Sequence, residues 1–71
     1  MTAWTTPYYG VQHTAKDAAG RWCSINDNGE WAELKRWYPG CQFHPERTAH
    51  DSAAEARNIG ERWLADHLQQ V

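Results

Sequence analysis

The sequence predicts a small α+β domain in which a three-stranded antiparallel sheet carries one C-terminal α-helix packed on one face (βββα). Three observations lead to this fold: helical periodicity near the C-terminus, alternation with a period of two in the first half, and an Asn28-Gly29 pair between two alternating segments. The 71 residues are near the lower limit for a domain that folds without metal or disulfide bridges. Residues 1–71 are therefore expected to form one domain.

A helix is expected over residues 53–70. This segment lacks proline, and its apolar side chains recur at steps of one turn, at Ala56, Ile59, Trp63 and Leu64. Ser52 and Glu55 have the spacing of a capping box at its N-terminus. Gly60 costs about 1 kcal/mol relative to alanine in mid-helix, so we expect it to mark the close approach of a strand.

Two strands are expected at residues 7–15 and 21–27, with a breaker-rich segment between them. In the first strand the side of Val11 and His13 is expected to face the core, and the side of Tyr8 and Gln12 to face outward. In the second strand Cys23 and Ile25 share the inner side, opposite Trp22.

The third strand is expected at residues 30–38, although the composition of this segment also suits a helix. A two-residue turn at Asn28-Gly29 would place Ile25 opposite Ala32 and Cys23 opposite Leu34, so that one face of the hairpin is small and apolar. That agreement favours a strand. The loop at residues 39–50 is long, and we expect a short extra strand around Gln42-Phe43.

The sheet face opposite the helix is the candidate site. One helix covers one side of a three-stranded sheet, so the other side meets solvent or a partner, or is covered by the N-terminal Trp4 segment or the long loop as a second small core. Trp and Tyr dominate interface hot spots. We name as partner-binding residues Tyr8, Trp22, Trp31, Lys35, Arg36 and Trp37.

The charge pattern speaks against a strongly electrostatic partner. Seven Lys plus Arg and nine Asp plus Glu give a net charge of −2, without a block of either sign. Phosphate-binding surfaces usually carry clustered positive charge. We also find no leader-like or membrane-spanning apolar run, which predicts a cytoplasmic protein with reduced cysteines.

No catalytic, cofactor or metal residue is predicted. The C-x-x-H pair Cys41 and His44 has the spacing of two zinc ligands, and further ligands could come from Cys23, His13, His50 and His67. Zinc sites, however, usually present two tight pairs. Cys41 with His44 or His50, oriented by Glu46 or Asp51, has the residue types of a nucleophilic pair, but the chain has little room for a substrate pocket. We therefore expect a protein that is not an enzyme and holds no cofactor.

The order of three strands and a helix, with GRWCSI before the turn and DSAAEARNIGERWL at the helix, resembles AP2-type and arm-type integrase DNA-binding domains. That resemblance implies DNA contacts from the open sheet at Arg21, Lys35 and Arg36. In this sequence the expected open face carries Glu33 and tryptophans where that family has cations. The compact, slightly acidic chain is also similar in kind to small phage-encoded inhibitors such as anti-CRISPR proteins, which act by occluding a surface of a host complex.

The leading hypothesis is a non-enzymatic protein-binding module that uses the aromatic face, in the manner of a phage or mobile-element inhibitor of a host complex or as a homodimer. The alternative is a nucleic-acid-binding domain that uses the same face, with bases stacked on the aromatic rings.

Overall fold

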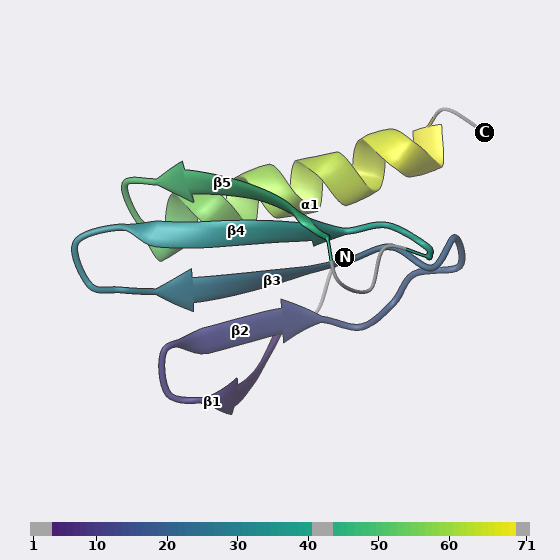
Figure 1. Cartoon of the computed structure of the whole chain (residues 1–71). Coiled ribbons are helices and arrows are strands. Elements are labelled where there is room, and N and C mark those ends of the chain that lie inside the picture. Colours follow the sequence, from purple (N-terminus) through teal and green to yellow (C-terminus); the bar gives the residue numbers. More distant parts are fainter. Residues whose placement is uncertain (1–3, 41–43, 70–71) are drawn as a thin grey trace.

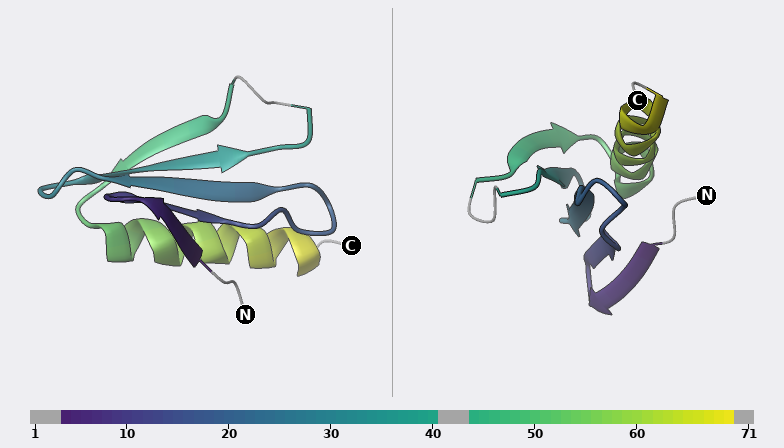
Figure 2. Two further views of the ribbon diagram at one scale, coloured as in Figure 1. Left: turned by 90° about the horizontal axis from the view of Figure 1, so that it is seen from below. Right: turned by 90° about the vertical axis from the view of Figure 1, so that its right-hand side faces the viewer.

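The computed structural model describes residues 4–40 and 44–69. Five strands form one antiparallel sheet in the order β1-β2-β3-β4-β5, and one helix lies across one of its faces (Figures 1 and 2). The predicted α+β class and C-terminal helix are confirmed, but the three-stranded sheet is wrong because two further strands are present. The elements are β1 (Trp4–Tyr8), β2 (Val11–Thr14), β3 (Trp22–Asp27), β4 (Ala32–Trp37), β5 (Glu46–His50) and α1 (Ala53–Gln69).

The single strand predicted at residues 7–15 is a hairpin. Tyr8 pairs with Val11 across β1 and β2, which leaves Tyr9 and Gly10 as the turn. Gly10 has a φ of 77°, in the left-handed region that glycine enters without steric cost. Tyr8 and Val11 therefore share a face, whereas unbroken alternation through residues 7–15 would place them on opposite faces.

The face of β2 that was expected to meet the core is the outer one. Val11 and His13 pair with β3 residues whose side chains point away from α1. Gln12 points toward the helix instead, where its Oε1 accepts a hydrogen bond from Arg57 Nη2 at 2.6 Å. Thr14 is buried on the same side and accepts a hydrogen bond from the Cys23 amide at 3.1 Å. Polar groups can take the inner positions of β2 because each of them finds a partner there.

Residues 30–38 contain the strand β4, so the choice of strand over helix is confirmed. The turn before it is centred one residue later than predicted, since the Asn28 amide donates to the Trp31 carbonyl at 2.9 Å and encloses Gly29 and Glu30. Gly29 has a φ of 89° at the first central position, where a type II′ turn requires glycine.

This turn moves the predicted register of β3 and β4 by two residues, so Ile25 lies opposite Leu34 rather than Ala32. A shift of two keeps every side chain on its own face. The predicted apolar inner side of the hairpin is therefore correct, although the predicted register is wrong. The buried core comprises Cys23, Ile25, Ala32, Leu34, Ala56 and Leu64.

The helix α1 crosses the core at Gly60. A Cβ atom at this position would lie 3.3 Å from Cys23 Sγ and 3.3 Å from Leu34 Cδ1, so the expected close approach of a strand is confirmed. Trp4 packs against the core from β1, and its Nε1 donates to Glu61 Oε1 of the helix at 2.8 Å. This contact joins the first strand to the C-terminal helix, between residues that are 57 positions apart in the sequence.

The predicted capping of α1 by Ser52 is confirmed, but the Glu55 carboxylate binds the amide one residue before the N-cap instead of the Ser52 amide of a standard capping box. The Glu55 amide donates to Ser52 Oγ at 3.1 Å, and Glu55 Oε2 accepts from the Asp51 amide at 3.2 Å. The helix was predicted over residues 53–70 and runs from Ala53 to Gln69, with residue 70 outside the described part of the chain.

The strand β5 lies within the segment predicted as a long loop. It pairs with β4 from Arg36 opposite Glu46 to Ala32 opposite His50, and thereby adds a fifth strand to the edge of the sheet. The extra strand expected around Gln42-Phe43 falls outside the described residues.

Candidate binding surface

The open face, defined as the side of the sheet away from α1, carries a stacked pair of tryptophans. Trp22 and Trp37 lie opposite each other on β3 and β4, with ring centroids 4.8 Å apart and planes 4° apart. Trp37 Nε1 donates to Ser24 Oγ at 3.1 Å, and His13 meets the edge of Trp22 at 6.0 Å. The sequence placed Lys35, not Trp37, opposite Trp22, and the two-residue change of register accounts for this error. Both indoles are half-buried because each covers the other.

Three other aromatic side chains are the most exposed large apolar groups of the described residues, and we call them the turn-end aromatics: Tyr8, Tyr9 and Trp31. Their relative exposures are 73%, 104% and 45%, respectively. Tyr8 ends β1, Tyr9 begins the β1–β2 turn, and Trp31 closes the β3–β4 turn. The two connections lie at the same end of the sheet (Figure 1) and are joined by a hydrogen bond from the Asp27 amide to the Gly10 carbonyl at 2.7 Å.

A shallow hollow of about 570 Å³ lies between these two turns. Tyr9 and Gly10 line it from the β1–β2 turn, and Asp27, Asn28 and Gly29 line it from the β3–β4 turn. Tyr9 was not among the predicted site residues. Its position directly before a glycine in a two-residue turn is the signal that would have placed it at the surface.

The predicted aromatic residues do not form one continuous exposed cluster. Trp31 and Trp37 stand at opposite ends of β4, and six residues of strand span roughly 20 Å. Tyr8 lies at the same end of the sheet as Trp31, while Trp22 lies at the other end, beside Trp37. The surface is therefore divided into an exposed turn end and a half-buried tryptophan pair.

The two predicted cationic residues lie on different faces. Lys35 is on the open face, 3.8 Å from Glu33 Oε1. Arg36 is on the helix side, where its Nη2 lies 3.9 Å from Glu46 Oε2. Arg36, expected at the polar rim of the open face, points to the opposite side from Lys35 because neighbouring residues of a strand alternate between the two faces.

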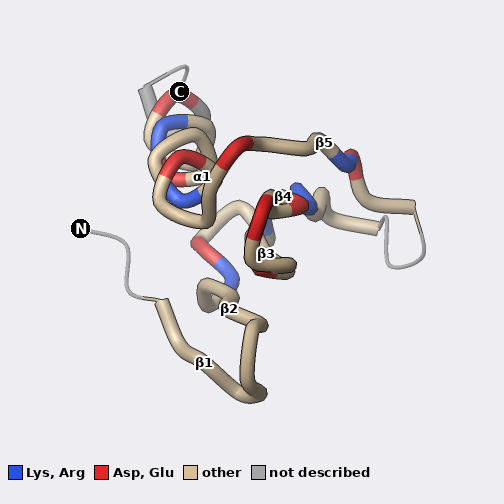
Figure 3. Tube along the Cα trace, turned by 90° about the vertical axis from the view of Figure 1, so that its left-hand side faces the viewer, with Lys and Arg blue, Asp and Glu red and all other residues tan. Residues whose placement is uncertain are grey.

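The turn end is acidic as well as aromatic. Asp27 and Glu30 are exposed at the β3–β4 turn, and Asp51 is exposed in the neighbouring β5–α1 connection. Figure 3 views the molecule from this end and shows acidic segments on the β3–β4 hairpin and before α1. Negative charge of this kind attracts cationic groups and repels phosphates.

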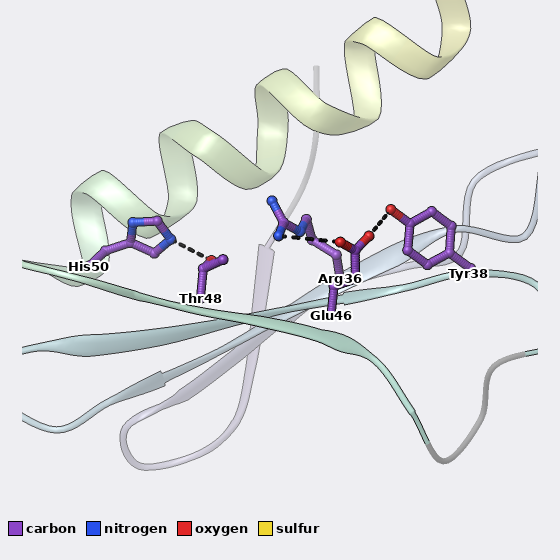
Figure 4. Close-up of polar contacts among 5 residues, drawn as sticks. All are labelled: Arg36, Tyr38, Glu46, Thr48 and His50. Atoms are coloured by element: carbon purple, nitrogen blue, oxygen red, sulfur yellow. Dashed lines mark hydrogen bonds and ion pairs between the residues drawn. The ribbon is translucent and has the colours of Figure 1, made fainter.

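The helix side holds a polar cluster near the end of β4 (Figure 4). The Tyr38 hydroxyl donates to Glu46, and this carboxylate raises the pKa of Tyr38 above its ordinary value, with burial adding to the effect. The guanidinium carbon of Arg21 lies 5.1 Å from the ring centre of Tyr38 and 5.2 Å from that of Trp63. Arg21 is therefore engaged with aromatic rings on the helix side rather than displayed along the open sheet.

A second hollow, of about 360 Å³, adjoins the tryptophan pair. Lys16 and Gly20 line it from the β2–β3 connection, and Pro39 and Gly40 from the chain after β4. One alternative was that the segment 39–50 folds over the open face as a second core. Residues 46–50 do not do so, since they extend the sheet at its edge as β5.

The cysteine and histidine candidates are dispersed. Cys23 is completely buried, its thiol lies 3.8 Å from the Gly60 carbonyl, and burial raises its pKa to about 12. A thiol of this kind is a weak nucleophile at neutral pH. Within the described ranges no three His, Cys, Asp or Glu side chains converge on a metal position, and Cys41 lies outside those ranges.

Among the residues with described structure, no helix combines the length and apolar character needed to cross a membrane. Comparisons of the chain with protein-family models, with curated proteins and with solved structures found no match.

Proposed function

We propose that this protein is a non-enzymatic protein-binding module that contacts its partner with the turn-end aromatics and the adjoining open face. The observation that carries the proposal is the exposure of Tyr8, Tyr9 and Trp31 at one end of the sheet, beside the hollow between the turns. Tyrosine and tryptophan supply large contact areas at a small cost in conformational entropy, and they are enriched at binding hot spots.

A protein of this size is suited to covering a surface of its partner, without changing the partner chemically. A standard interface buries about 800 Å² on each side, which would be about a sixth of the 4990 Å² surface described here. We propose occlusion of a partner surface as the mode of action, as in the phage-encoded inhibitors to which the chain is similar in kind.

Nucleic acid is the less favoured partner. Of the three cations that the integrase-type resemblance would carry over, Arg21 and Arg36 lie on the helix side, and Lys35 has Glu33 beside it. The exposed aromatic rings could stack on bases, but the acidic turn end would repel the phosphate backbone.

The test compares capture of a partner by the wild-type chain and by a Tyr9→Ser/Trp31→Ser variant from nuclease-treated lysate of the native host. Loss of one specific captured protein in this variant, with an unchanged thermal transition, is the expected result. Asn58→Ser, at an exposed position of the helix, is the matched control and should retain capture.

A fluorescence titration with mixed oligonucleotides separates the two classes of partner. We expect weak binding that does not depend on Trp31. Tight binding that weakens steeply as salt rises would overturn the proposal in favour of the nucleic-acid alternative.

A further inference from the structure

The two edge strands of the sheet differ in how they expose their backbone. β1 contains Pro7 and shows a register shift between Thr5 and Tyr8, and both features discourage pairing with another strand. β5 contains no proline and keeps an unbroken register with β4 over all five residues. No strand from the described residues pairs with its outer side (Figures 1 and 2). Among the described residues, β5 is therefore the more regular of the two edge strands and the one without proline.

The hydrogen-bonding pattern of the sheet determines which amide and carbonyl groups of β5 point away from β4. The Asn28 amide bonds to Trp31, so alternate pairs along the hairpin, such as Asn26 and Glu33, are hydrogen-bonded pairs. The bond from the Asp27 amide to Gly10 gives the same alternation on the other side of β3. Hence Ala32, Leu34 and Arg36 turn their backbone groups toward β5.

The β5 residues opposite these three are His50, Thr48 and Glu46, which use their backbone groups toward β4. Arg47 and Ala49 consequently direct their amide and carbonyl groups away from the sheet. Both residues are exposed, so the outer side of β5 presents two amide donors and two carbonyl acceptors.

We propose that β5 pairs antiparallel with β5 of a second copy of this chain, in the register centred on Thr48. Arg47 then lies opposite the partner's Ala49, and Ala49 lies opposite the partner's Arg47. These two pairs satisfy the outward-facing amide and carbonyl groups of both strands. Glu46 lies opposite the partner's His50 on the helix side of the sheet, so a carboxylate meets an imidazole twice. The side chain of Glu46 is 53% exposed and retains acceptor capacity beyond its contacts with Tyr38 and Arg36 (Figure 4).

Neighbouring registers fit less well. Centring the pair on Arg47 would place this cation opposite itself and would set Ala49 opposite the partner's Pro45, which has no amide hydrogen. Centring it on Ala49 would require the amide of Asp51, which already donates to Glu55 in the helix cap. The self-complementary sequence of β5 thus selects a second copy of this chain as occupant.

The two-fold axis of this pairing stands perpendicular to the sheet. Both helices therefore lie on the same face of a continuous ten-stranded sheet, and both open faces remain uncovered. The pairing uses none of the turn-end aromatics, so this inference and the proposed function can fail independently.

Two substitutions at one exposed position test the pairing. Ala49→Lys places a cation opposite the partner's Arg47 twice, whereas Ala49→Glu places a carboxylate there twice. Charge pairs across strands contribute enough to shift the dimer dissociation constant by about 2- to 30-fold. We expect Ala49→Lys to raise this constant and Ala49→Glu to lower it, as measured by sedimentation equilibrium.

The same position provides an internal control, because Ala49 lies opposite Glu33 of β4 within one chain. Lys at this position should stabilise the monomer slightly and Glu should destabilise it, which is the reverse of their effects on the dimer. A general effect of either variant on folding therefore cannot imitate the expected result.

Hydrogen exchange locates the contact. The amides of Arg47 and Ala49 should gain protection as the protein concentration rises, while the Thr48 amide, directed toward β4, should be protected throughout. A protein that stays monomeric up to about 1 mM, a dimer equally stable in both Ala49 variants, or association without added protection at Arg47 and Ala49 would each overturn the proposal.

Discussion

Trp22 and Trp37 face each other across β3 and β4 with nearly parallel rings, 4.8 Å between centroids. This pair replaces the predicted neighbours Trp22 and Lys35, and it occupies the end of the hairpin opposite the turn. Offset aromatic stacking adds about 0.5 to 1.5 kcal/mol beyond the burial of area. The tryptophan pair therefore helps to hold β3 against β4, whereas Trp31 is exposed and forms part of the surface.

We predict that Trp37→Ala lowers the free energy of unfolding by about 2 kcal/mol, because it removes the stack and part of a half-buried ring. Trp31→Ala should cost less than about 0.5 kcal/mol, as is usual for exposed positions. Urea denaturation followed by far-ultraviolet circular dichroism measures both. Equal losses in the two variants would contradict this division between a structural and a surface tryptophan.

The faces of the β3–β4 hairpin were predictable because alternation is a local property. Cys23, Ile25 and Leu34 were placed in the core correctly even though the register was wrong by two residues. The register itself depends on whether Asn28-Gly29 or Gly29-Glu30 occupies the centre of the turn. That choice involves pairings such as Trp22 with Trp37, which are distant in sequence and leave no local signal.

The two additional strands escaped prediction for different reasons. The turn at Tyr9-Gly10 lacks the Asn-Gly or Asp-Gly pair that marks a two-residue hairpin most strongly, so the segment looks like one long strand, although the turn places Tyr8 and Val11 on the same face. β5 contains no large apolar residue and owes its strand conformation to the free edge of β4, a tertiary contact. Of the candidate site, alternation predicted exposed positions for Tyr8 and Trp31, but it excluded Arg36, whose parity is opposite to that of Lys35.

Gly60 gives a second prediction. Alanine gains about 1 kcal/mol in a helix over glycine, but its Cβ would meet two completely buried side chains, Cys23 and Leu34, at 3.3 Å. Overpacking of this kind costs about 1 to 3 kcal/mol, so Gly60→Ala should be destabilising by about 1 kcal/mol overall.

A double-mutant cycle identifies the cause of that loss. Cys23→Ala removes the Sγ atom, so the combined Gly60→Ala/Cys23→Ala variant should be more stable than the sum of the single changes predicts. Additive losses, or a stabilising effect of Gly60→Ala alone, would show that the helix and strand move apart without cost.

The N-terminus of α1 gives a third prediction. Ser52→Ala removes the acceptor for the Glu55 amide and should cost about 1 kcal/mol in the free energy of unfolding. Ser52→Asp retains a capping oxygen and places negative charge at the positive end of the helix dipole, so it should preserve stability. Thermal unfolding of the three proteins measures the effect. Equal destabilisation by Ala and Asp would mean that the hydroxyl does not act as a cap.

The buried thiol of Cys23 gives a prediction about alkaline pH. Burial raises its pKa from 9.0 to about 12, with opposing effects from the charges of Arg36, which lowers it, and Asp17, which raises it. In the unfolded chain the thiol ionises near its ordinary value. The folded state therefore holds this proton more tightly, and its contribution to stability is complete below pH 9 and is lost as the pH rises toward 12.

The free energy of unfolding should accordingly fall by about 1.4 kcal/mol for each pH unit above 9 on account of this group alone. We expect that slope to be absent in Cys23→Ala, compared with its parent in a Cys41→Ser background so that only one thiol differs. Guanidinium denaturation at pH 8, 9 and 10 measures the difference, and Tyr38, which also has a raised pKa, is common to both proteins. Parallel losses of stability would mean that the Cys23 thiol ionises in the folded protein as readily as in the unfolded chain, which its position against Gly60 and Leu34 argues against.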